Sequence, residues 1–199
     1  MKNYLHNYLL KLSGAGGHLD FGSVTCRYGK FTMYCIIGPE ENLVQVTFAP
    51  ARHEQVLKQL VNLNSNVRIS KLQQKEFYFN TKFIDYFAGS RTSFSFPADS
   101  LLVTAGTEFQ KRVWRHIGAI PFGSCITYQR LAALAGSSKA ARAAGTACGS
   151  NPLAVIIPCH RVVSVNGLGG FAGGVAVKNA LLTLEHAGSD TEENCRQSD

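Results

Sequence analysis

Residues 107–149 constrain the fold most, because they read as three short helices whose ends are marked in the sequence. Thr107 is a plausible N-cap for a helix over 107–120. One face of this helix is apolar, with Phe109, Val113, Trp114 and Ile117 at helical spacing. The segment Pro121-Phe122-Gly123 is expected to end it.

Two further helices follow at once. Thr127 is expected to cap YQRLAALA, which Gly136 closes, and Ser137 and Ser138 are candidate caps for KAARAAGTACG over 139–149. Two short helices joined by a glycine turn match a helix-turn-helix. The alanines of the second helix leave little bulk, so its axis can approach a protein neighbour or a DNA groove. Dense packing inside the protein explains most alanine-rich helices, and this helix alone does not decide between the two.

The first half of the chain differs from the second in composition and in the spacing of its apolar residues. Aromatic and β-branched residues between glycine turns predict antiparallel strands over 21–49. Helical spacing predicts a helix over 53–64 and a second one over 75–89. We therefore expect an α/β unit over residues 1–100 with a connector from about 90, a second unit over 101–187 and an acidic tail over 188–199. The first unit shows no dense cluster of chemical groups, so the sequence assigns it no function.

Charge is distributed unevenly. The chain has 20 basic and 13 acidic side chains, and residues 101–187 hold eight basic residues but only two acids, Glu108 and Glu185. A basic segment of this kind favours a polyanionic partner over a merely solvated basic face only when other evidence agrees.

Six cysteines, without a CxxC pair or a repeated spacing, argue against a zinc ribbon, and we predict no metal and no cofactor. Unpaired thiols fit a reducing cytoplasm, or a nucleus in a eukaryote. No apolar run approaches the length of a membrane span, and His6, Asn7 and Lys11 break the apolar N-terminal stretch, which argues against a cleaved export signal.

The segment IIPCHRVV, residues 156–163, carries the chemistry. It reads as an apolar strand that Pro158 interrupts, because proline has no amide donor. A free cysteine is most often a small buried hydrophobe. Against that reading, His160 and Arg161 are costly to bury unpaired, and a nearby base or cation raises the thiolate fraction of Cys159.

Two more features support an activated thiol. Five glycines within VNGLGGFAGG, residues 165–174, suggest backbone that passes close to a ligand. An activated thiol needs its base oriented by a third group, and Glu185 is the only acidic residue near in the sequence. Since neighbouring strand residues point to opposite sides, His160 is expected to reach Cys159 through a non-ideal backbone or a bridging water.

Several motifs, in the same order and spacing, resemble those of the O6-alkylguanine-DNA alkyltransferases, the methylated-DNA–protein-cysteine methyltransferases. They are GTEFQKRVW, IPFGSCITYQRLA, ARAAGTACGSNP, IIPCHRVV, GGFAGG and KNALLTLE. The resemblance covers residues 86–187 in detail and implies a mixed α/β fold: a small RNase H-like N-terminal domain followed by a winged helix-turn-helix domain. It also implies a single-turnover repair enzyme, a monomer whose partner is double-stranded DNA that carries O6-alkylguanine.

The resemblance assigns roles by position. Cys159 matches the acceptor thiol, His160 its water-linked base and Glu185 the carboxylate that orients the base. Asn151 matches the residue that braces the turn before the active site, and Tyr128 the donor to guanine N3.

The DNA-binding set and the substrate pocket are implied in the same way. Arg142 matches the arginine that fills the space of the flipped nucleotide, and the matching DNA contacts are Thr127, Tyr128, Ala140, Ala141 and Gly145. Expected pocket residues are Cys148, Val162, Phe171, Ala172 and Lys178. Phe171 replaces a frequent tyrosine, Ala172 a frequent serine and Cys148 a usually apolar residue, which leaves the preferred adduct size open.

Two other functions remain as alternatives. One is a non-catalytic alkyltransferase-like protein that binds lesions, although such relatives replace the acceptor cysteine. The other is a helix-turn-helix DNA-binding regulator, which leaves His160, Glu185 and the glycine loop unexplained.

Overall fold

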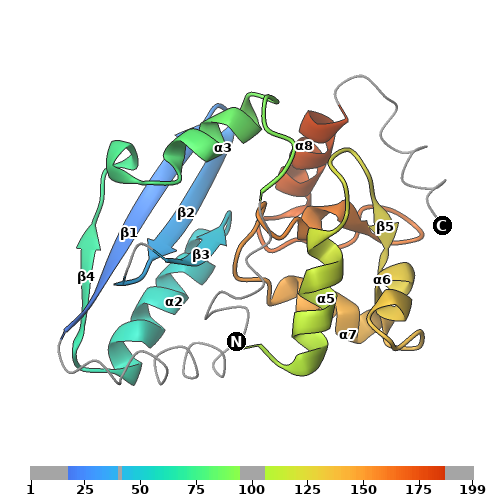
Figure 1. Cartoon of the computed structure of the whole chain (residues 1–199), viewed down its shortest axis with the longest axis horizontal. Helices are drawn as coiled ribbons and strands as arrows, with labels where there is room; N and C mark the ends of the chain where they lie inside the picture. The colour runs from blue at the N-terminus through green and yellow to red at the C-terminus, as the bar shows by residue number, and fades with distance from the viewer. Residues whose placement is uncertain (1–17, 40–41, 95–105, 187–199) are drawn as a thin grey trace.

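The computed structural model describes residues 18–39, 42–94 and 106–186. The N-terminal stretch, most of the predicted connector and the acidic tail lie outside the described residues. Figure 1 shows a sheet with two helices on one side of the molecule and a mainly helical part on the other. This mixed α/β architecture is the one predicted from the sequence.

A four-stranded sheet forms the first part, in the order β3-β2-β1-β4. Its strands are β1 (Leu19–Tyr28), β2 (Phe31–Ile37), β3 (Leu43–Thr47) and β4 (Val67–Lys71). β1, β2 and β3 pair antiparallel, as predicted for 21–49, and Gly29 supplies the left-handed residue of the β1–β2 turn with φ +56°. β4 pairs parallel with β1 and was not predicted. Its sequence, VRISK, is mostly exposed and carries two charged side chains, so it gave a weak strand signal.

Two helices cover the sheet. The helix α2 (Pro50–Leu63) lies where a helix over 53–64 was predicted, and it buries Val56 and Leu60. The predicted helix over 75–89 is instead divided: a 3₁₀ turn over Gln74–Glu76 precedes α3 (Asn80–Phe87). The break arises because the side chain of Glu76 accepts a hydrogen bond from the Gln73 amide (2.6 Å), which closes a capping box over the short turn.

The second part contains the helices α5 (Glu108–Gly118), α6 (Tyr128–Leu134), α7 (Ala141–Gly149) and α8 (Val175–Glu185), with the short strands β5 (Ile126–Thr127) and β6 (Val162–Val163). Thr107 and Thr127 cap α5 and α6 by accepting backbone hydrogen bonds, as predicted. The prediction for α7 was wrong in detail. Ala140 occupies its N-cap position, because the residues from Ser137 form a separate turn, closed by a bond from the Ala140 amide to the Ser137 carbonyl (2.9 Å).

The run LAVIIPCHRVV does not form the predicted strand. It makes a tight turn with Val155 at φ +72°, then a 3₁₀ turn over Cys159–Arg161, and only Val162–Val163 pair with β5. Pro158 has no amide to donate, and the Ile157 carbonyl is already bonded to the side chain of Asn151. The segment that carries Cys159 is therefore folded as a turn and not as a strand.

The two parts share one hydrophobic core. β3 contacts the turn before the 3₁₀ segment directly: the Val46 amide donates to the Pro152 carbonyl (2.8 Å) and the Ala154 amide to the Val46 carbonyl (3.0 Å). Trp114, fully buried on α5, fixes α7 through a bond from its indole nitrogen to the Ala147 carbonyl (2.9 Å). None of the helices in the described ranges combines the length and apolar character that a membrane span requires.

Candidate active site

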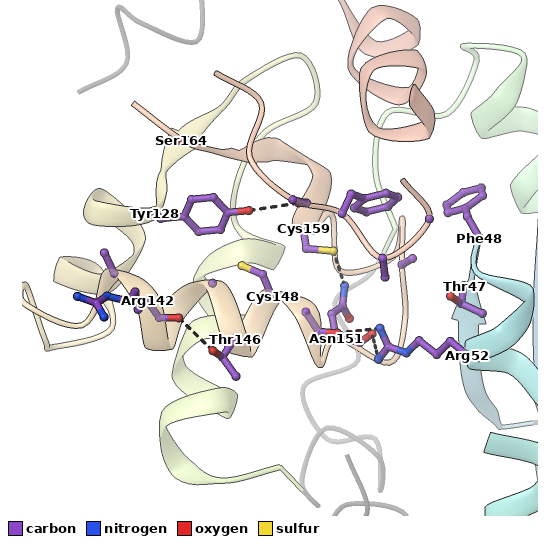
Figure 2. A pocket seen from close by; sticks show the side chains of 18 of the residues that line it. Thr47, Phe48, Arg52, Tyr128, Arg142, Thr146, Cys148, Asn151, Cys159 and Ser164 are labelled. Carbon is purple, nitrogen blue, oxygen red and sulfur yellow. Dashed lines mark hydrogen bonds between the residues drawn. The ribbon is translucent and has the colours of Figure 1, made fainter. Parts of the chain in front are cut away.

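A pocket of about 770 Å³ lies between the sheet part and the consecutive helices α6 and α7, which were expected to form a helix-turn-helix, and Cys159 lines it. Figure 2 shows Cys148 and Cys159 near its middle, Tyr128 and Arg142 toward one end, and Phe48 and Arg52 toward the other. The 3₁₀ turn, α7 and β3 thus each contribute to one cavity.

Cys159 is only 8% exposed. Asn151 donates from its side-chain nitrogen to the Cys159 sulfur (3.1 Å) and to the Ile157 carbonyl (2.7 Å), while its oxygen accepts from the Leu153 amide (3.0 Å). Both amide hydrogens and the amide oxygen are therefore used, and the turn that presents the thiol is closed by one side chain.

His160 follows Cys159 in the chain and pairs with Glu185 outside the pocket lining, and both side chains are fully buried. The Nε2 atom of His160 is 2.7 Å from Oε1 of Glu185. An ionised carboxylate only accepts hydrogen bonds, so Nε2 carries the proton and Nδ1 is left as an acceptor. Nδ1 is buried and has no hydrogen-bond partner among the described residues. This orphaned acceptor is where a bridging water would meet the imidazole.

Arg161 supplies the counter-charge for Glu185. Its Nε atom donates to Oε2 of Glu185 (2.7 Å) and its Nη2 atom to Oε1 (2.9 Å), while Nη1 donates to the Ile120 carbonyl (2.6 Å). The guanidinium also lies over the ring of Phe122, 5.7 Å from its centre. The sequence flagged Arg161 as costly to bury but did not identify this pairing, which needs two segments far apart in the chain.

The protonation states follow from burial. Burial raises the pKa of Cys159, against the bond from Asn151 and the charges of Lys178 and Arg52, which lower it. Burial lowers the pKa of His160, and the contact with Glu185 opposes this only in part. Burial also disfavours ionised Glu185, but the bonds from His160 and Arg161 outweigh it and lower the pKa of the carboxyl. At neutral pH the resting site therefore holds a thiol beside a neutral imidazole.

Tyr128 and the glycine loop form one wall of the pocket. The Tyr128 hydroxyl donates to the Gly170 carbonyl (3.3 Å), and burial raises its pKa to about 12, so it remains protonated. Gly169 has φ +69°, and a Cβ atom there would lie 2.8 Å from the Tyr128 ring. A Cβ at Gly173 would lie 2.5 Å from Cβ of Phe48. The glycines therefore allow the loop to pack closely on the aromatic side chains of the pocket.

Lys178 lies beneath the same loop and is fully buried. Its ammonium donates to the Val162 carbonyl (2.6 Å) and to the Gly170 carbonyl (3.4 Å). Burial lowers its pKa to about 8, and the charge that it retains at neutral pH favours the thiolate form of Cys159. Lys178 joins α8 to both strand β6 and the loop.

The predicted site residues fall into two groups. Those that line the pocket are Tyr128, Ala141, Arg142, Gly145, Cys148, Asn151, Cys159, Phe171 and Ala172. Those that lie outside its lining are Thr127, Ala140, His160, Val162, Lys178 and Glu185. Arg142 is exposed near the start of α7, whereas Thr127 and Ala140 are the N-cap residues of α6 and α7.

Residues of the sheet part also reach the site and were missed, among them Val46 and Thr47 of β3, which line the pocket. Arg52 of α2 donates to the Gly149 carbonyl (2.8 Å) and the Asn151 carbonyl (2.9 Å), and Phe48 lines the pocket. Tyr86 of α3 donates to Glu185 (2.6 Å). An isolated arginine, phenylalanine or tyrosine in an α/β unit carries no local signal for such a contact.

Cys26, Cys35, Cys148 and Cys159 are free thiols. Across residues 18–39, 42–94 and 106–186, histidine, cysteine and acidic side chains nowhere form a group of three suited to a metal ion.

Two consecutive helices beside a pocket with a buried thiol, next to a histidine–carboxylate pair, are an arrangement typical of DNA-binding proteins that carry a reactive cysteine. The family model of the 6-O-methylguanine DNA methyltransferase DNA-binding domain matches residues 108–187. The methylated-DNA–protein-cysteine methyltransferase of Methanosarcina acetivorans is 39% identical over 153 residues, which cover 75% of this chain and 89% of that protein. The chain belongs to the methylated-DNA–protein-cysteine methyltransferase family.

A further relative carries the same family name, and solved structures of related proteins share the fold. The protein of the same name from Salmonella typhimurium is 47% identical over 106 residues, which span 52% of this chain and 60% of that protein. The crystal structure of Mycobacterium tuberculosis O6-methylguanine methyltransferase is similar with a TM-score of 0.62 and 28% identity, covering 87% of this chain and 97% of the other. The same organism's OGT in complex with DNA gives a TM-score of 0.63 at 29% identity, over 83% and 93% of the two chains.

Proposed function

We propose that the protein repairs DNA by moving an alkyl group from O6 of guanine in duplex DNA to the sulfur of Cys159, once per molecule. The observation that carries the proposal is the position of Cys159 in the pocket, with Asn151 on its sulfur and the adjacent His160 paired with Glu185. The transfer needs no cofactor, because the acceptor is part of the chain.

The transfer balances as a displacement. The Cys159 thiol gives its proton to Nδ1 of His160 through a water, and the sulfur attacks the alkyl carbon. The sulfur–carbon bond forms as the carbon–O6 bond breaks, and the bonding electron pair goes to guanine. Guanine takes a proton at N3, for which Tyr128 is the candidate donor because it is protonated and lines the same pocket. The product is a thioether, which offers no step that regenerates the thiol.

Access to the lesion requires base flipping, since O6 of a stacked guanine is out of reach of a buried sulfur. We infer that Arg142 fills the space that the base leaves, and its exposed position in the pocket lining near the start of an alanine-rich helix supports this role. The basic residues of 101–187 would bind phosphates without sequence preference, as surveillance of damage requires.

The test is mass spectrometry after mixing the protein with an oligonucleotide that carries O6-methylguanine. We expect one added methyl group on the peptide that holds Cys159, and none in Cys159→Ala. Cys148→Ala is the matched control, because it removes a second free thiol from the same pocket. Methyl removal from DNA by a folded Cys159→Ala variant would overturn the proposal.

Two alternatives predict different results. A non-catalytic lesion-binding protein would bind the oligonucleotide and acquire no methyl group. A DNA-binding regulator would prefer one sequence whether or not the lesion is present. We further propose that the protein acts as a monomer, in the cytoplasm or, in a eukaryote, in the nucleus, where its DNA lies.

A further inference from the structure

Tyr86 is the one described residue of the sheet part whose side chain contacts the His160–Glu185 pair by a hydrogen bond. Its hydroxyl donates to Oε1 of Glu185 (2.6 Å), and the same oxygen is 3.5 Å from Nε2 of His160. The ring is fully buried, packed against Phe87, Phe94 and Phe122. The hydroxyl therefore has one position, and that position is on the carboxylate.

The donors on Glu185 are distributed unequally between its two oxygens. Oε1 is shared by Tyr86, His160 and Arg161, whereas Oε2 accepts from Arg161 (2.7 Å) and from the Gly123 amide (3.3 Å). Oε1 is the oxygen that holds the imidazole, so its electron density determines how strongly Glu185 attracts a protonated His160. A neutral donor on that oxygen reduces the attraction and fixes the carboxylate in place.

We propose that Tyr86 is a positioning residue for alkyl transfer, by which the sheet part of the protein tunes the base that accepts the proton of Cys159. This inference rests on the proposed function. It gives the N-terminal α/β unit a part in the chemistry, because its helix α3 completes the set of donors on Glu185.

The direction of the effect can be derived from the charges around His160. Glu185 and Lys178 act on it from α8, Arg161 from its own turn, and Tyr86 lies near it on α3. Loss of the Tyr86 hydroxyl makes Oε1 a stronger acceptor and stabilises the imidazolium. The pKa of His160 then rises, and the fraction of neutral base falls in weakly acidic solution.

The experiment uses the full chain and measures the rate of Cys159 alkylation by free O6-benzylguanine as a function of pH. In Tyr86→Phe we expect the rate to fall about threefold to tenfold, the range that one hydrogen bond supports. We also expect the acid limb of the pH–rate profile to move to higher pH. Nitrogen-15 NMR of the histidine ring should show the same upward movement of the His160 titration.

Tyr28→Phe is the matched control. Tyr28 is also a buried tyrosine of the sheet part, stacked on Phe87, and its hydroxyl donates to Asn80 (2.9 Å) away from the site. It loses one hydroxyl from the same aromatic cluster, so it should lose similar stability and keep the wild-type rate and pH profile. Equal profiles for wild type and Tyr86→Phe, or equal rate losses in the two variants, would overturn the proposal.

A second measurement covers the case in which Tyr86→Phe does not fold. Incorporation of 3-fluorotyrosine at position 86 keeps the ring and makes the hydroxyl a stronger donor, so the acid limb should move to lower pH. The same change at position 28 should leave it in place, and an unmoved limb at position 86 contradicts the proposal. Methyl transfer by the wild type is measured in parallel, so failure of the proposed function is seen separately.

Discussion

Arg161 and Glu185 form a buried ion pair in which the guanidinium contacts both carboxylate oxygens, at 2.7 and 2.9 Å. Arg161 alone therefore supplies a positive charge that balances the Glu185 carboxylate. Burial lowers the pKa of His160, the contact with Glu185 opposes this only in part, and the charge of Arg161 lowers it further.

Removal of Arg161 should leave a buried carboxylate without its counter-charge. We expect Arg161→Met to lower the free energy of unfolding by about 3–5 kcal/mol, as loss of one partner of a buried pair does. Urea denaturation at neutral pH measures this. Lys111→Met breaks the exposed pair between Lys111 and Glu108 and should change nothing measurable. A similar stability for both variants would contradict the buried ion pair.

The pH dependence of stability should have two stages. In the unfolded chain a histidine takes up a proton below about pH 6.5. Buried His160 has a lower pKa and stays neutral over part of that range. The free energy of unfolding therefore falls as the pH decreases from about 6.5 to the pKa of His160 in the folded protein. Glu185, with its lowered pKa, contributes stability above about pH 4.3 that is lost at lower pH.

The variant His160→Gln tests whether the first stage of this stability loss arises from His160. His53, whose pKa burial also lowers, contributes the same slope to both proteins, so the difference between them isolates His160. We expect wild type to lose more stability than His160→Gln between about pH 6.5 and 5. Parallel curves over that interval would contradict a neutral buried His160.

A methyl group at position 169 should disturb Tyr128. Gly169→Ala adds a Cβ atom 2.8 Å from the ring at φ +69°, and we expect a loss of about 1–3 kcal/mol in the free energy of unfolding and slower transfer from duplex DNA. Gly170→Ala is the matched control, because a Cβ atom there meets nothing within 4 Å. Equal rates for the two variants would show that the close approach of loop and ring is unimportant.

Arg142 is expected to act on duplex DNA and not on the chemical step. Arg142→Ala should slow repair of an oligonucleotide far more than reaction with free O6-benzylguanine, which needs no extrusion from a stack. Arg115→Ala removes the same charge from an exposed position on α5 outside the pocket lining, and should slow repair of the oligonucleotide less than Arg142→Ala does. Equal losses of both reactions in Arg142→Ala would exclude a role in base flipping.

Local signals predicted the helical part of the fold well. Thr107 and Thr127 are followed by apolar residues at helical spacing, and both cap helices in the structure. The segment around Cys159 was predicted less well, since its β-branched residues favour a strand. The side chain of Asn151 overrides that preference by bonding Ile157 and Leu153, and such a tertiary bond is not visible in local sequence.

The candidate site was predictable only in part. Cys159, His160 and Glu185 are marked by residue type and by a scarcity of other acids, so the sequence could single them out. Arg52 and Tyr86 enter from helices about 100 residues earlier, at sequence separations of 99 from Asn151 and Glu185. Their roles depend on how two units dock, which no periodicity or motif encodes.

The low exposure of Cys159 has a consequence under the proposed function, in which each molecule reacts once. Peroxides and small electrophiles attack thiolates, whereas Cys159 is buried and burial raises the pKa of its thiol. Under that proposal, burial preserves unreacted molecules, and their number would set how many lesions a cell can repair before it synthesises more of the protein.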